Sequence, residues 1–177
     1  MTFAHLPAGF ITCTLLYDVY KHRIRSYKTY LFWGLLGSVL PDFDFAYLFL
    51  FDEAGTNHHV YITHYPIFWA VLLIASAFWL HFDRKSQLPV SAFLFTLGGF
   101  IHMFLDTVSG RMYWFAPFSY SVLSGDNMLF SIAPDYAQSH RHWGYGVELL
   151  IIFWAAYLYH RNVNSEESEV SALKKDT

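Results

Sequence analysis

Residues 88–108 read LPVSAFLFTLGGFIHMFLDTV. This stretch is mostly apolar and carries only two ionisable side chains, His102 and Asp106, near its end. Because about 20 apolar residues cross the hydrocarbon core of a bilayer as a helix, the stretch predicts a membrane-spanning helix. Gly98 and Gly99 remove side-chain bulk from its middle, as small residues do where membrane helices pack closely. We therefore expect the ionisable pair to face a neighbouring helix rather than lipid.

Four further apolar stretches predict the remaining helices. They are residues 5–20, 30–51, 65–82 and 144–159. Together the five stretches predict an all-α integral membrane bundle of about five helices, forming a single domain over residues 1–163. The polar residues 164–177 predict a disordered tail. The alternative is a soluble, all-helical protein with very hydrophobic helices.

Composition narrows the function classes. Of the 177 residues, 55% are hydrophobic and 14% are charged, against about 25% charged in an ordinary soluble domain, which excludes a disordered chain. The net charge of -3 excludes the basic surface typical of a nucleic-acid-binding protein, so no nucleic-acid partner is expected. The single cysteine, Cys13, excludes an internal disulfide and a cysteine-based zinc site. Any metal would be held by His, Asp or Glu.

Lysine and arginine residues divide unevenly between the connections. One set, in alternate connections, comprises Lys21, Arg23, Arg25, Lys28, Arg84, Lys85, Arg161, Lys174 and Lys175. Only Arg111 and Arg141 fall on the other side. The positive-inside rule then predicts an external N-terminus and a cytoplasmic C-terminus. The long connection 109–143 would face outward, between the last two helices, and its many aromatic residues favour a lid.

The ionisable residues gather on the outward side. All but three of the ten histidines fall there, the exceptions being His22, His81 and His160. His102 and Asp106 are four residues apart and so share one helix face, which suits a common metal ion. The alternative is a neutral histidine whose hydrogen bond is satisfied by the carboxylate.

Two carboxylates interrupt the second span within Leu40-Pro41-Asp42-Phe43-Asp44. On a regular helix Asp42 and Asp44 would point roughly 200° apart. Proline bends a helix, and a bend at Pro41 brings the two carboxylates closer to a common site. We expect at least one of them to be a ligand, the alternative being that one caps a broken helix end.

Further histidines lie at outward helix ends. His59 and His64 precede the third span, His5 begins the first, and His142 opens the fifth. From spacing alone, His5 is equally well a ligand or an exposed terminal residue. The predicted metal ligands are His5, Asp42, His59, His64, His102 and Asp106, and the predicted catalytic residues are Asp44 and His142.

This donor set contains nitrogen and oxygen but no thiolate, which suits zinc, manganese or iron. Zinc is the main expectation, as one or two ions, with manganese as the alternative. A two-metal centre makes hydroxide near neutral pH and clamps both oxygens of an in-line displacement at phosphorus. The sequence therefore favours metal-dependent hydrolysis at the membrane.

The order of these motifs resembles that of a known family. His5, Leu40-Pro41-Asp42-Phe43-Asp44, His59 through Thr63-His64, and Gly98/Gly99 followed by His102 and Asp106 are similar to the motifs of the LexA-regulated, membrane-bound metal-dependent hydrolases of bacteria. The resemblance covers roughly residues 1 to 125 and implies an inner-membrane hydrolase. A more remote similarity, to the zinc-dependent phospholipase C and nuclease fold, implies phosphoester chemistry. The implied partners are membrane lipid and a lipid or lipid-linked phosphoester substrate.

Three other functions remain open. Buried His and Asp residues also relay protons or carry a divalent cation in membrane transporters. His64 and His102 would be the axial pair of a bis-histidine haem protein, although this leaves the carboxylates unexplained. The last alternative is a structural membrane protein without catalytic activity.

Overall fold

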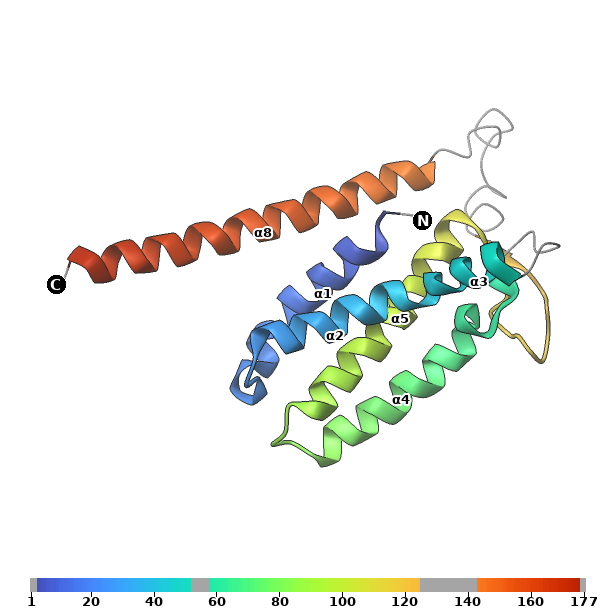
Figure 1. The fold of residues 1–177 in the computed structure, drawn as a ribbon, viewed down its shortest axis with the longest axis horizontal. Helices are drawn as coiled ribbons and strands as arrows, with labels where there is room; N and C mark the ends of the chain where they lie inside the picture. Colours follow the sequence, from blue (N-terminus) through green and yellow to red (C-terminus); the bar gives the residue numbers. More distant parts are fainter. Residues whose placement is uncertain (1–2, 52–57, 125–142, 176–177) are drawn as a thin grey trace.

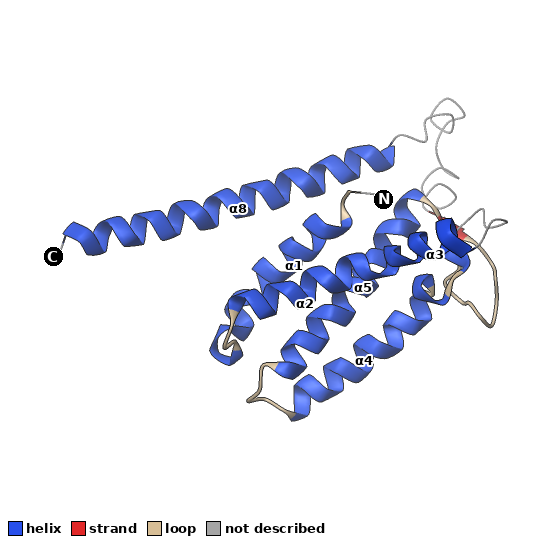
Figure 2. Cartoon of the chain, in the orientation of Figure 1, coloured by secondary structure: helices blue, strands red, loops and turns tan. Residues whose placement is uncertain are grey.

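The computed structural model describes residues 3–51, 58–124 and 143–175. Five long helices and one short helix account for most of them (Figures 1 and 2). The α-helices are α1 (His5–Tyr20), α2 (Tyr27–Val39), α3 (Asp44–Phe51), α4 (Pro66–Phe82), α5 (Leu88–Ser109) and α8 (Trp143–Lys175). Short 3-10 helices are η1 (Lys21–Arg23), η2 (Leu40–Phe43), η3 (His58–Val60) and η4 (Ile62–His64). The predicted all-α fold is confirmed, with one addition: β1 (Arg111–Met112) pairs antiparallel with β2 (Leu123–Ser124).

Among the described residues, two segments are long and apolar enough to cross a membrane, Tyr27–Phe51 and Leu88–Val108. The first combines α2, η2 and α3. Helix α4 is apolar but shorter, and α1 coincides with the predicted first stretch. Large apolar side chains lie on the outside of the bundle, among them Phe78 on α4 and Phe153 on α8, which are 62% and 69% exposed. An apolar outer surface of this kind suits lipid as the surrounding medium.

Helix α5 lies between α2 and α4 (Figure 1). A Cβ atom added to Gly98 would lie 2.8 Å from the carbonyl oxygen of Gly34, so the backbones of α5 and α2 are in direct contact. Gly99 faces the indole ring of Trp69 on α4, which leaves no space for a side chain there. The predicted role of these glycines in close helix packing is confirmed.

The two connections that carry basic residues, between α1 and α2 and between α4 and α5, meet at one end of the bundle. The guanidinium of Arg23, between α1 and α2, donates from Nη2 to the carbonyl oxygen of Ser86, between α4 and α5, at 3.1 Å. The backbone N–H of Arg25 donates to Gln87 Oε1 at 2.7 Å. The two connections therefore lie on the same side of the bundle, as the alternation of basic residues requires. That this side is cytoplasmic stays a prediction.

Helix α8 packs beside α1 (Figure 1). The buried carboxylate of Glu148 accepts hydrogen bonds from the backbone N–H groups of Phe3 and Ala4, at the start of α1. Glu148 thus satisfies N–H groups that have no partner within α1 itself.

The end of α8 differs from the sequence-based expectation. The helix continues to Lys175, through the residues 164–175 for which a disordered tail was predicted. A helix that is already nucleated by its apolar part extends at little further cost, which explains how polar residues join it.

Candidate metal centre

Five elements bring ionisable side chains to the end of the bundle opposite the basic connections. His5 begins α1, Asp42 lies in η2, and His102 and Asp106 lie one turn apart on α5. Pro41 is the second residue of the 3-10 turn η2, and this turn interrupts the helix at the place where the sequence predicts a bend. His59 and His64 come from η3 and η4. The six predicted metal ligands are thus brought together; whether they bind metal stays a prediction.

Four of these residues form the centre of the cluster: His5, Asp42, His102 and Asp106. One oxygen of Asp106 lies 3.2 Å from His5 Nε2, and the other lies 3.0 Å from His102 Nε2. The carboxylate of Asp42 lies 3.4 Å from His102 Nε2 and 4.0 Å from His5 Nε2. Ligands about 2.0–2.2 Å from a tetrahedral zinc ion are separated by roughly 3.3 Å, so these spacings fit a shared ion.

His64 and His59 lie at the border of this group. His64 Nε2 is 3.6 Å from Asp106 Oδ2 and 3.7 Å from Asp42 Oδ1. His59 Nε2 is 3.7 Å from Asp106 Oδ2. His58, His59 and His64 also form a second group, in which one nitrogen from each ring lies within 4.8 Å of the others. The arrangement therefore has donors for one ion and a second group that suits another.

Backbone carbonyl groups fix the orientation of two imidazole rings. His102 Nδ1 lies 2.8 Å from the carbonyl oxygen of Ser38, and His59 Nδ1 lies 2.8 Å from that of Arg111. A carbonyl oxygen only accepts hydrogen bonds, so each Nδ1 carries the proton in the neutral ring and donates it. The lone pair is then on Nε2, which faces the carboxylates. Metal-binding histidines are commonly held in this way by a second partner.

The buried donor atoms fit a metal ion better than they fit one another. Among the described residues, His64 Nε2 and His102 Nε2 are buried and have no hydrogen-bond partner. Asp106 Oδ2 lies 3.6 Å and 3.0 Å from these two nitrogens, but in the neutral rings with the proton on Nδ1 each contact sets one acceptor against another. Buried polar atoms of this kind are rare because leaving them unpaired costs free energy. A bound cation would satisfy both nitrogens and balance the charge of the two carboxylates. The set of nitrogen and oxygen donors matches zinc or manganese.

The pKa values of His64 and His59, which lie outside the membrane-spanning segments, reflect the charge of the nearby carboxylates and the burial of the rings. Burial alone would lower the pKa of His64, but contacts with Asp106, Asp42 and Asp44 outweigh it and raise the pKa to about 10. Burial lowers the pKa of His59 to about 4, so this ring is neutral at pH 7. The carboxylates thus favour a positive charge at His64, and His59 presents a neutral nitrogen.

Asp44 lies behind His64 rather than within the central group. Its carboxylate accepts hydrogen bonds from Thr63 Oγ1 at 2.6 Å and from His64 Nδ1 at 2.6 Å. It also lies 3.2 Å from His58 Nδ1. The position is that of a carboxylate that orients a histidine ligand. Its predicted catalytic role stays a prediction.

Asp44→Asn should therefore weaken metal binding without abolishing it. The asparagine keeps the shape of the side chain but removes the negative charge that holds His64 Nδ1–H. Loss of such an orienting partner typically reduces metal affinity by about 10- to 100-fold. Competition with a zinc chelator, followed by elemental analysis, measures this change. Unchanged affinity would show that Asp44 does not orient a ligand.

Among the described residues, Asp42 is the most exposed member of the cluster, followed by His59 with a side chain that is 13% exposed. The side chain of Asp42 is 27% exposed, whereas those of His5 and Asp106 are each 3% exposed and those of His64 and His102 are fully buried. Within the described part of the chain, a substrate or a water molecule would therefore reach the centre past Asp42.

Several contributors were not predicted from the sequence. The carbonyl groups of Ser38 and Arg111 carry no residue-specific signal, because every residue has one. Glu148 is a glutamate within an apolar stretch, which is a usable signal for a buried partner. The predicted catalytic residue His142 lies outside the described residues.

The fold and the cluster define an all-helical membrane protein with a histidine and aspartate centre at one end of its bundle. The model of a family described as "YdjM inner membrane protein" matches residues 1–167. The chain belongs to this family, and its predicted place in the inner membrane is thereby supported. No curated protein and no solved structure matches the chain.

Proposed function

We propose that this protein is a metal-dependent hydrolase whose active site is the cluster around Asp42 and Asp106. The observation that carries the proposal is the convergence of three buried imidazoles, those of His5, His64 and His102, on these two carboxylates. A proton relay or a structural bundle has no need for donors gathered at the spacing of a metal coordination sphere. The resemblance to membrane-bound metal-dependent hydrolases implies the same activity.

A divalent metal, as one or two zinc ions or alternatively manganese, would supply Lewis acidity and lower the pKa of a bound water. His5, His102 and Asp106 would hold it from the buried side. Asp42 would hold it from the open side and border the substrate. Asp44 would keep His64 in place through Nδ1.

A lipid or lipid-linked phosphoester is the proposed substrate class. The cluster lies near the end of Leu88–Val108 and, through Asp42, at the 3-10 turn that interrupts Tyr27–Phe51. We infer that this position is within reach of the lipid headgroups. Exposed apolar side chains surround this end: Phe43 follows Asp42 directly, and Ile62 lies two residues before His64. Their exposed fractions are 61% and 63%, so both are available to lipid. The proposed orientation places the cluster on the outer face, with the C-terminus in the cytoplasm.

A cation transporter is a weaker reading of the same residues. Transport needs a polar path from the cluster to the basic end. Between them, the described interior is closed by the buried side chains of Cys13, Tyr30, Val90 and Leu94. Contacts between the backbones of α2 and α5 close it further. A packed interior between the cluster and the basic end, within the described chain, favours hydrolysis over transport.

The test is a hydrolytic activity that requires both the metal ion and the side chains proposed to bind it. Detergent-purified protein should hydrolyse chromogenic phosphodiesters or phospholipids, lose this activity on treatment with EDTA, and regain it with zinc or manganese. His102→Ala should abolish the activity because it removes a buried ligand. His160→Ala, an exposed histidine of α8, is the matched control and should retain it.

Two results would contradict the proposal. Protein that contains metal but hydrolyses no phosphoester would point to storage or transport of the ion. Equal loss in His102→Ala and His160→Ala, with loss of folded protein in both, would show that the histidines have general structural roles.

A further inference from the structure

A second pocket lies at the basic end of the bundle, opposite the metal centre. Its volume is about 460 Å³, within the range of roughly 300–1,000 Å³ that is typical of ligand sites. The lining residues come from the end of α1 with η1 and from the end of α4 with the connection that follows. They are Val19, Tyr20, His22, Arg23, Ala77, Leu80, His81 and Arg84.

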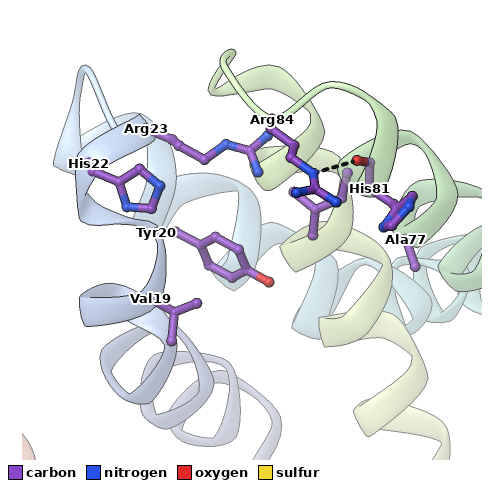
Figure 3. Close-up of a pocket in the computed structure, with 8 residues that line it drawn as sticks. Val19, Tyr20, His22, Arg23, Ala77, His81 and Arg84 are labelled. Atoms are coloured by element: carbon purple, nitrogen blue, oxygen red, sulfur yellow. Dashed lines mark hydrogen bonds between the residues drawn. The ribbon is translucent and has the colours of Figure 1, made fainter.

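The pocket has a basic part and an apolar part. Arg23, Arg84, His22 and His81 supply two permanent positive charges and two imidazole N–H donors. Val19, Ala77 and Leu80 supply an apolar wall. None of the lining residues is acidic. In Figure 3 the side chains of Arg23 and Arg84 extend into the same space from their two connections.

The Arg23 side chain is fixed in place. It is only 9% exposed, and its Nε and Nη2 atoms donate to the carbonyl oxygen of Ser86 at 3.3 Å and 3.1 Å. Nη2 also donates to the carbonyl oxygen of Asp83. Within the described chain, Nη1 makes no hydrogen bond. An arginine held by uncharged carbonyl groups keeps its full charge for a ligand.

The nearest carboxylate, that of Asp83, interacts with the charge of Arg23 but is held mainly by other donors. Asp83 accepts hydrogen bonds from the backbone N–H groups of Lys85 and Ser86, at 3.0 Å and 3.1 Å, and from the Ser86 hydroxyl. Asp18 pairs with Lys21 at 3.0 Å. Neither aspartate lines the pocket. Asp83 therefore offsets part of the charge of Arg23, but the pocket itself, lined by Arg23 and Arg84 and by no acidic residue, remains positively charged.

We propose that this pocket binds the headgroup of an anionic phospholipid. The phosphate would lie between Arg23 and Arg84, because guanidinium groups match phosphate oxygens in geometry. The glycerol and the first part of the acyl chains would lie on the apolar wall. Basic pockets between membrane helices hold anionic headgroups in this manner. A zwitterionic lipid fits less well because the pocket has no acidic side chain to receive its ammonium group.

The experiment uses the full-length protein reconstituted in nanodiscs of phosphatidylcholine that contain a minor fraction of phosphatidylglycerol. Native mass spectrometry after release into detergent reports which lipid is retained. The wild type should retain phosphatidylglycerol in preference to phosphatidylcholine. Arg84→Gln should reduce this preference about fivefold, because it removes one basic side chain near a headgroup. Arg84 is exposed and, among the described residues, its side chain donates only to the carbonyl oxygen of His81, so the variant should fold.

Arg25→Gln is the matched control. Arg25 is an exposed arginine at the same end of the bundle, does not line the pocket, and its replacement changes the net charge equally. It should leave the preference unchanged. An equal reduction in both variants would overturn the proposal in favour of general attraction to a basic surface. Displacement of the lipid by millimolar inorganic phosphate would overturn it in favour of a soluble anion.

Discussion

Asp106→Asn is expected to abolish metal binding. Both oxygens of Asp106 contact histidine nitrogens, one at His5 and the other at His102. It is also the carboxylate nearest to His59. An amide in its place keeps the volume but replaces one negatively charged oxygen by a donor NH₂ group. The variant should therefore lose a metal ligand and present N–H groups to the ion instead.

The expected loss in metal affinity is at least about 100-fold, the upper range for removal of a group that only orients a ligand. Elemental analysis of detergent-purified protein should find one to two equivalents of zinc or manganese in the wild type. It should find close to none in the variant. Size-exclusion chromatography shows whether the variant is folded.

Asp18→Asn is the matched control, because Asp18 is an exposed aspartate that pairs with Lys21 at the far end of α1. This variant should retain the metal of the wild type. Retention of metal by Asp106→Asn would remove the centre of the proposed site. A wild type that is folded, contains no metal and cannot be loaded would favour a proton relay or a structural role.

Much of the site was predictable from the sequence because ionisable residues are unusual within apolar segments. Aspartate and histidine are costly within apolar segments, so His102, Asp106 and Asp42 stand out by type alone. The four-residue spacing of His102 and Asp106 predicts a common helix face, and the structure has them 3.0 Å apart. Their convergence with His5 could not be derived from spacing, because it depends on how α1 packs against α5.

The role of Asp44 shows where the sequence carries too little information. Asp42 and Asp44 are both acidic and both follow Pro41, so composition does not distinguish them. The 3-10 turn of η2 directs Asp42 toward His102, while Asp44 begins α3 and contacts His64 Nδ1. Only the path of the backbone makes Asp42 a candidate metal ligand and places Asp44 behind His64. The extension of α8 to Lys175 is likewise decided by the preceding helix rather than by local composition.

The largest effect on folding is expected from Gly37→Ala. A methyl group at this position would overlap with the backbone carbonyl of Phe95 on α5. Because backbone cannot rotate away as a side chain does, α2 and α5 must move apart. Overpacking of this kind typically costs about 1–3 kcal/mol. We expect a value near the upper limit, about 3 kcal/mol, and a melting temperature lower by roughly 10 °C.

The same substitution at Gly146 on α8 should not lower the stability of the protein. A Cβ atom there has no described neighbour within 4 Å, and alanine favours a helix over glycine by about 1 kcal/mol. Gly146→Ala should therefore leave the melting temperature unchanged or raise it. The comparison separates close helix contact from the intrinsic preference of the residue, because the chemical change is identical in both variants.

The effect of Gly37→Ala should extend to the metal centre. Ser38, the next residue, holds His102 Nδ1 through its carbonyl oxygen at 2.8 Å. If α2 moves away from α5, this hydrogen bond lengthens and His102 loses the contact that directs Nε2 toward Asp106. Metal affinity should then fall together with stability, measured by chelator competition below the melting temperature. A destabilised variant with unchanged metal affinity would show that the ligands hold His102 in place without help from α2.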